Sequence, residues 1–154
     1  MQLSFFDGTV PFKIDKPIRM VELFGGYGSQ ALALKYLGVP FEHWKMSEWA
    51  IKSIQAYKDL HAADDNTDYS AGLTETEIKA WLNGRISSNY NEPLTEAQIA
   101  RLTESAVRTI YNNMKATQNL GSITTIKGGG LEITETDKYC YIMTYSFPLC
   151  CVKI

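Results

Sequence analysis

The sequence has few of the features that mark secreted, membrane or fibrous proteins. Its 154 residues include three cysteines, and because Cys150 and Cys151 are adjacent, they offer no disulfide framework. No apolar run approaches the roughly 18 residues that a membrane-spanning helix needs. Residues 1–7 lack the basic start and long apolar core of a signal peptide. We therefore expect a soluble protein of a reducing, cytoplasmic compartment.

Neither sign of charge dominates the chain. Lys and Arg number 15 and Asp and Glu number 17, which gives a net charge of −2. Because there is no overall basic field, contact with nucleic acid would need a local basic patch. Arg101, Arg108 and Lys115 offer one candidate patch, and a solvated helix face is the alternative for them. The hydrophobic fraction of 45% is sufficient for a core.

Residues 18–60 alternate between strand and helix patterns. Residues 18–24 form a short apolar run that is typical of a buried strand, and glycines end it. A helix is expected over residues 29–37, a second strand over 41–47 and a second helix over 50–58. This order predicts an α/β fold with a parallel sheet, preceded by an extension over residues 1–17.

Residues 61–118 predict a helical insert, because the segment is too long for a plain loop. Two capping boxes, at Thr74–Glu77 and Thr95–Gln98, mark helix starts. Apolar residues from Ile99 to Met114 recur at helical spacing and predict one longer helix. Residues 84–93 are rich in turn formers and link the two helical parts.

Residues 119–154 predict the remainder of the sheet. Residues 121–126 form a short β-prone stretch, and Gly128–Gly130 predict a hinge or tight loop. Residues 139–147 are rich in Tyr, Ile and Thr and predict a strand, which brings the expected number of strands to about four. Left as an edge, this last strand would favour self-association or pairing with another chain.

The order of strand, glycine turn and helix around Gly25–Gly28 is the strongest indication of a ligand site. Glycines let a ligand come close to the backbone, and the helix that follows presents free N–H groups. Ligands of open α/β sheets bind at the carboxyl ends of the strands. A tight turn without a ligand is the alternative.

Three further residues indicate an adenosine-containing cofactor. Glu48 lies 20 residues after Gly28, where a carboxylate accepts hydrogen bonds from both hydroxyls of a ribose. Trp49 offers a flat apolar face to an adenine. Glu22 favours the cationic amino group of S-adenosylmethionine over a pyrophosphate, which it would repel. The alternative for Glu22 is a helix cap or a salt bridge.

Four motifs in this order resemble those of the DNA cytosine-5 methyltransferases, over residues 19–148. They read VELFGGYG at 21–28, SEWA at 47–50, NLGSI at 119–123 and, before the catalytic position, YIMTYSFP at 141–148. The overall pattern is similar to phage-borne or restriction–modification members. The resemblance implies a Rossmann-like methyltransferase fold, S-adenosyl-L-methionine as cofactor and DNA as partner. The implied cofactor-binding residues are Glu22, Leu23, Phe24, Gly25, Gly26, Tyr27, Gly28, Ser29, Glu48, Trp49, Ser122 and Ile123.

The resemblance also implies a role for each motif. Phe24 and the glycine turn would line the cofactor pocket, with Glu22 near the methionine end. Glu48 would bind the ribose and Trp49 would pack on the adenine. The third motif would border the adenine, with Ser122 where the family usually has Asp.

The catalytic motif departs from the family pattern. The family's nucleophilic Cys directly follows Pro and adds to carbon 6 of a flipped cytosine. Here Leu149 separates Pro148 from Cys150, which shifts the thiol by about 3.5 Å. Cys150 is therefore either a displaced nucleophile or a free thiol. We expect residues 149–154 to be frameshifted sequence and the chain to be an N-terminal fragment, inactive alone, that a complementary C-terminal fragment would complete.

Two other functions remain open from the sequence. One is a non-catalytic module that binds S-adenosylmethionine or pairs with the other part of a split enzyme. The other is a small nicotinamide oxidoreductase, which would prefer a dinucleotide. The dinucleotide fingerprint is incomplete, because Ala31 occupies the position of its third glycine. We expect no metal site, and structural roles for His43 and His61.

Overall fold

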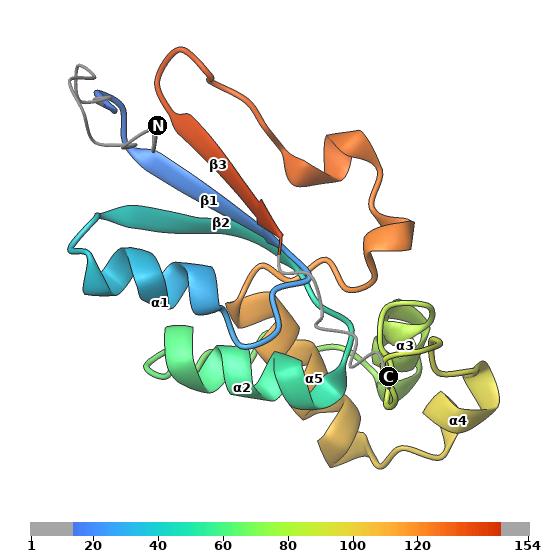
Figure 1. The fold of residues 1–154 in the computed structure, drawn as a ribbon. Helices are drawn as coiled ribbons and strands as arrows, with labels where there is room; N and C mark the ends of the chain where they lie inside the picture. Colours follow the sequence, from blue (N-terminus) through green and yellow to red (C-terminus); the bar gives the residue numbers. More distant parts are fainter. Residues whose placement is uncertain (1–13, 146–154) are drawn as a thin grey trace, which may run out of the picture.

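Three parallel strands form the sheet in the computed structural model, which describes residues 14–145. The central strand is β1 (Ile18–Leu23), with β2 (Phe41–Ser47) on one side and β3 (Cys140–Tyr145) on the other (Figure 1). Helices cross over between the parallel strands, as such pairing requires. The expected α/β, Rossmann-like fold with an incomplete sheet is confirmed.

The burial of β1 follows from its central place in the sheet. Its first five residues are buried, and both of its edges are paired, so that Ile18 lies opposite Phe41 on β2 and Cys140 on β3. A strand covered on both faces has no polar side to present to water. The register with β2 shifts after Met20, and Trp44 takes the extra position in β2.

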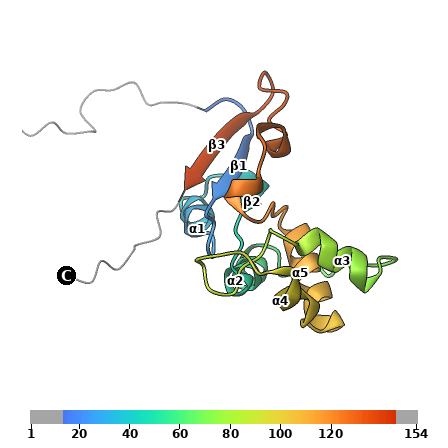
Figure 2. The same cartoon turned by 90° about the vertical axis from the view of Figure 1, so that its right-hand side faces the viewer.

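The first helices lie on one side of the sheet, and two short 3₁₀ helices lie on the other (Figures 1 and 2). The helices are α1 (Ser29–Tyr36) and α2 (Ile51–His61), which confirms the expected strand–helix–strand–helix order. The 3₁₀ helices are η1 (Ile123–Thr125) and η2 (Gly128–Leu131). The indole N–H of Trp44 donates to the carbonyl of Leu131 at 3.0 Å and ties η2 to β2.

The insert region contains α3 (Glu75–Leu82), α4 (Glu96–Ala100) and α5 (Glu104–Ala116). Both predicted capping boxes are present, at the starts of α3 and α4. The prediction of one helix from Ile99 to Met114 is wrong. The side chain of Thr103 accepts a hydrogen bond from the backbone N–H of Ala106 and starts α5 as a separate helix.

The main hydrophobic core lies between α2 and the insert helices. α2 packs against α5, α5 packs against α3, and α3 contacts α4, so the helices of residues 61–118 share a core with the first α/β unit. Side chains there are nearly or fully buried, and they include aliphatic residues from each helix. The cluster consists of Ile54, Ile78, Leu82, Ile86, Leu94, Ile99, Val107, Ile110, Tyr111 and Met114.

The expected count of about four strands is wrong for the described residues, which hold three. Gly121 has a φ of 81°, which turns the chain out of the extended conformation. The hydroxyl of Ser122 then accepts from the backbone N–H of Thr124 and starts η1. Pairing of this segment with β2 is limited to one parallel bridge between Met46 and Asn119. The predicted glycine hinge at 128–130 lies within η2.

The last expected strand is confirmed over its described part, as β3. Residues 146–147, and with them Pro148, Leu149 and Cys150 of the catalytic motif, lie outside the described residues. Within residues 14–145, no helix is long and apolar enough to cross a membrane.

Candidate cofactor site

The glycine turn after β1 is built from left-handed backbone conformations. Phe24, Gly26 and Gly28 have φ values of 55°, 56° and 79°. The N–H of Gly28 donates to the carbonyl of Gly25 at 2.7 Å, and the N–H of Gly25 donates to the carbonyl of Ser47 at 3.0 Å. The turn is therefore closed on itself and joined to the end of β2.

Two glycines of this turn face different surroundings. A Cβ built on Gly26 would meet no atom within 4 Å, whereas one on Gly28 would lie 2.3 Å from Nε2 of His61. Gly28 is needed for packing, and Gly26 leaves open space at the backbone. The side chains of Phe24 and Tyr27 are 48% and 61% exposed beside it. The turn thus has an open side where a ligand reaches the backbone.

Glu48 lies directly after β2 and contacts the glycine turn. Its Oε2 accepts from the N–H of Gly26 at 2.9 Å, and its Oε1 accepts from the N–H of Ala50 at 2.7 Å. Each carboxylate oxygen has capacity for a second hydrogen bond. Glu48, the residue predicted to bind the ribose, is therefore adjacent to the predicted glycine turn. Its carboxylate oxygens can still accept hydrogen bonds from two hydroxyls.

Asn119 joins the third motif to the second. Its Oδ1 accepts from the N–H groups of Glu48 (3.1 Å) and Gly121 (2.9 Å), and its Nδ2 donates to the carbonyl of Glu48 (2.9 Å). The hydroxyl of Ser47 also donates to the carbonyl of Gly121 at 2.8 Å. Sequence reasoning placed Asn119 in a motif but gave it no role, and no spacing marks a side-chain amide as such a link.

The remaining predicted residues lie around this junction. Leu23 ends β1, and Ser29 starts α1 with its hydroxyl bonded to the side chain of Gln30. Trp49 is partly buried directly after Glu48. Ser122 is buried, and its hydroxyl is bonded within its own turn; Ile123 follows it in η1.

Glu22 is enclosed below the turn and is 1% exposed. Its Oε1 accepts from the N–H of Ala31 in the first turn of α1, at 3.3 Å, and its Oε2 accepts from the hydroxyl of Tyr57 at 2.5 Å. Burial raises the pKa of Glu22, and the two hydrogen bonds oppose that rise. These contacts match the helix-cap alternative, and contact with a ligand amino group stays a prediction.

Two histidines complete the support beneath the turn. Because the hydroxyl of Tyr57 donates to Glu22, its oxygen accepts from Nδ1 of His43 at 2.9 Å. Nε2 of His61 donates to the carbonyl of Tyr27 at 2.9 Å. Burial, with the charges of His61 and Lys35, lowers the pKa of His43 to about 4, and burial also lowers the pKa of His61. Both rings are therefore neutral at pH 7.

The sequence predicted a structural role for His61 but not its contact with the turn, and it gave no supporting role to Tyr57. Both lie on α2, far along the chain from the turn that they hold. Their helical spacing indicates only a buried face. Among the residues described, no group of three or more His, Cys, Asp or Glu side chains is placed to hold a metal ion.

The donors and acceptors of the site fit the ribose of an adenosyl cofactor. A parallel sheet with an open glycine turn after β1 and a carboxylate after β2 is the arrangement by which Rossmann-like folds bind adenosine-containing ligands. The acceptor capacity of Glu48 beside the open backbone of Gly26 is the feature that meets this requirement.

Comparison with known proteins gives two methyltransferases as relatives. The chain is 28% identical over 135 residues to the orphan methyltransferase M.SssI of Spiroplasma monobiae, covering 86% of this chain and 34% of the relative. It is 29% identical over 136 residues to the type II methyltransferase M2.ScrFI of Lactococcus lactis subsp. cremoris, covering 85% and 35%. No family model matches the chain.

These similarities confirm the resemblance to methyltransferases that the four motifs indicate. The chain spans about a third of the length of these relatives.

Proposed function

We propose that this chain is the cofactor-binding part of a DNA cytosine-5 methyltransferase, an enzyme that transfers a methyl group from S-adenosylmethionine to carbon 5 of cytosine. The observation that carries the proposal is the set of hydrogen bonds among Gly26, Glu48, Asn119 and Gly121. They gather three of the family-like motifs at one edge of the sheet. The similarity to two methyltransferases over most of this chain supports it.

The proposed roles follow from the positions of the residues. Glu48 accepts hydrogen bonds from the ribose hydroxyls, and the cofactor lies against the open backbone at Gly26. Trp49 packs on the adenine, which Ser122 and Ile123 border. S-adenosylmethionine supplies an electrophilic methyl group when it is bound.

The part of Glu22 in this proposal is to set the charge at the methionine end from below the turn. Its carboxylate is held by Ala31 and Tyr57, so it acts on a nearby amino group through its field. Phe24, Tyr27 and Ser29 are exposed beside the turn, and in this proposal they contact the cofactor from the solvent side.

We further propose that the chain alone does not methylate DNA. Leu149 lies between Pro148 and Cys150, and catalytic geometry does not tolerate a shift of one residue in the nucleophile. DNA is then a partner of the longer enzyme, completed by a complementary chain. The same insertion favours the second candidate function, a non-catalytic cofactor-binding or partner-pairing module.

Calorimetry on the full chain tests the cofactor assignment. S-adenosylhomocysteine is expected to bind, and NADH is not. Glu48→Gln removes a charge-assisted acceptor and should lower the affinity for S-adenosylhomocysteine about 10- to 100-fold. Glu92→Gln is the matched control, because Glu92 is exposed in the link before α4, and it should bind as the wild type does. Tighter binding of NADH than of S-adenosylhomocysteine would contradict the assignment.

Sequencing of the encoding DNA through and beyond the codon for Pro148 tests the fragment assignment. If another frame continues with Cys directly after Pro148, the protein of the repaired frame should methylate carbon 5 of cytosine, and replacing that Cys should abolish the activity. If no frame continues, the binding or pairing module is the better description.

A further inference from the structure

A cavity of about 720 Å³ lies beside the third motif, where Asn119 and Leu120 line it, and none of the predicted cofactor residues does. It lies where the end of α5 meets β2, the link after α3 and the segment of η1 and η2. Four cationic side chains line it, each from a different one of these elements, together with one carboxylate, Glu132. The cations are Lys45, Arg85, Lys115 and Lys127.

The positive charge of this cavity is only partly compensated. Glu132 pairs with Lys45 at 2.9 Å, and the side chain of Lys45 is 9% exposed. Within residues 14–145, Arg85, Lys115 and Lys127 form no ion pair. Burial lowers the pKa of Lys115, and the charges of Arg85 and Lys45 lower it further. Like charges held together in this way favour the entry of an anion.

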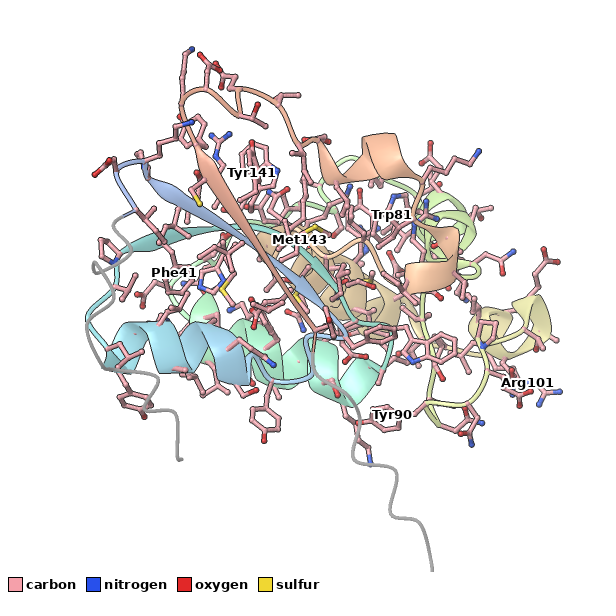
Figure 3. All side chains as sticks on the ribbon, turned by 45° about the horizontal axis from the view of Figure 1, so that its top comes forward. Phe41, Trp81, Tyr90, Arg101, Tyr141 and Met143 are labelled. Atoms are coloured by element: carbon pink, nitrogen blue, oxygen red, sulfur yellow. The ribbon has the colours of Figure 1, made fainter. Side chains whose placement is uncertain are left out.

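Aromatic packing holds two of these cations in place. Arg85 Cζ and Lys115 Nζ lie 4.8 and 4.6 Å from the centre of the Trp81 indole ring. Nη1 of Arg85 also donates to the carbonyl of Trp81 at 2.6 Å, and the ring edge meets Tyr111. In Figure 3, Trp81 lies beside the η1–η2 segment. Such contacts pre-organise the cations, unlike the solvated helix face that is the alternative for Lys115.

We propose that this cavity binds phosphate groups, carried either by a nucleotide or by a nucleic-acid strand. Arg and Lys are the side chains that recognise phosphate, and several oxygens of one phosphate reach cations from different elements. A volume of about 720 Å³ suits a ligand of nucleotide size. The inference does not rest on the proposed methyltransferase function, because none of the four cations is a predicted cofactor residue, although Asn119 of the candidate site also lines the cavity.

Binding of two probes to the full chain tests the site: pyrophosphate by calorimetry, and a fluorescent DNA duplex of arbitrary sequence by anisotropy. Lys115→Gln and Arg85→Gln should each lower the affinity for the probe that binds in the cavity at least tenfold. Matched controls are Lys52→Gln, exposed on α2, and Arg101→Gln, exposed after α4. Figure 3 shows Arg101 far from Trp81. Both controls should bind within about twofold of the wild type, the range expected of exposed sites.

The two probes distinguish the sources of phosphate. If pyrophosphate competes with the duplex, and Lys115→Gln reduces the salt dependence of duplex binding by about one unit of slope, the ligand is a nucleic-acid strand. If only pyrophosphate depends on the cavity residues, the ligand is a nucleotide. Binding that is equal in wild type, cavity variants and controls, or absent for both probes, overturns the proposal.

Two checks separate loss of the site from loss of folding and from failure of the proposed function. Lys127 is exposed and lies outside the helical core. Lys127→Gln should therefore lower the affinity for the same probe without a change in melting temperature. S-adenosylhomocysteine binding is measured in every variant and should be unchanged.

Discussion

At the scale of single residues, Asn119 determines the geometry of the candidate cofactor site. It is 4% exposed, and its amide satisfies two N–H groups and one carbonyl of Glu48 and Gly121. Since buried backbone groups without partners are costly, no apolar side chain replaces it without loss. Asn119 is therefore a positioning residue for Glu48.

The substitution Asn119→Ala should lower the free energy of unfolding by about 2–4 kcal/mol, because it leaves buried polar groups unpaired. It should also weaken the binding of S-adenosylhomocysteine, although Glu48 itself is retained. Urea unfolding and calorimetry measure the two effects. Asn66→Ala is the control, since Asn66 is exposed and makes one local bond. A stable variant with unchanged affinity would refute the positioning role.

Stability should fall as the pH is lowered from 7 to 5, because His43 and His61 are held neutral beneath the glycine turn. The pKa of His43 is about 4 in the folded chain and 6.5 ordinarily. As the pH falls, the unfolded chain therefore binds a proton at this histidine before the folded chain does, and acid lowers the free energy of unfolding. Glu22, whose pKa is raised, acts in the opposite direction. Urea midpoints at several pH values measure the balance.

His43→Asn isolates the histidine contribution in that experiment. Asn offers an N–H near the position of Nδ1, for the hydroxyl of Tyr57, but does not titrate. Its urea midpoint should change less between pH 7 and pH 5 than that of the wild type. Equal changes in the two proteins would show that His43 does not supply the pH dependence. Lys35 stays in both proteins, so its charge cancels from the comparison.

At the scale of elements, the turn between β1 and α1 needs glycine for two different reasons: a left-handed backbone at Gly26, and both that backbone and close packing at Gly28. Gly28→Ala places a Cβ 2.3 Å from His61 and 2.8 Å from Tyr57, and it should cost about 3 kcal/mol or more. Gly26→Ala has the same backbone strain but no neighbour within 4 Å, so it should cost about 1–2 kcal/mol. Thermal unfolding compares them. Equal losses would mean that strain, and not packing, requires Gly28.

Elements with strong local signals could be predicted from the sequence. The apolar run of β1, the glycine turn and the two capping boxes each depend on residues close together in the chain. The break between α4 and α5 could not be predicted from the sequence, because the helical periodicity of apolar residues continues across it, whereas Thr103 starts a new helix. The segment after Gly121 has β-branched residues, yet its backbone turns at the glycine and forms η1.

The candidate site was predicted in part for the same reason. Spacing after the turn located Glu48, because a strand–helix–strand unit has a nearly fixed length. The side-chain bonds of Asn119, Tyr57 and His61 depend on how distant segments pack, and residue type alone gives no such information.

At the scale of the whole molecule, β3 is an edge of the sheet within the described residues. Met143 and Tyr145 on this strand are 46% and 60% exposed, and Figure 3 shows Met143 near Tyr141 on β3. An exposed apolar edge strand favours pairing with another chain. This feature agrees with the partner-pairing part of the proposed function.

The chain should therefore self-associate with rising concentration, and Met143→Lys should reduce that association, because a charge on an edge strand opposes pairing. Sedimentation velocity over a concentration series measures it. Tyr36→Lys is the control, because Tyr36 is 88% exposed at the end of α1, away from the edge. If both substitutions reduce association equally, the effect is one of net charge.

The pairing of β1 with β3 has a consequence for how the protein folds during synthesis. Arg19 and Tyr141, partners across these strands, are 122 positions apart in the chain. The ribosome therefore delivers β1, α1 and β2 long before the strand that completes the second edge of β1. Closing so long a loop is entropically slow. Until then the most buried of the described strands has one unpaired edge, and we expect a nascent chain in that state to need protection by chaperones.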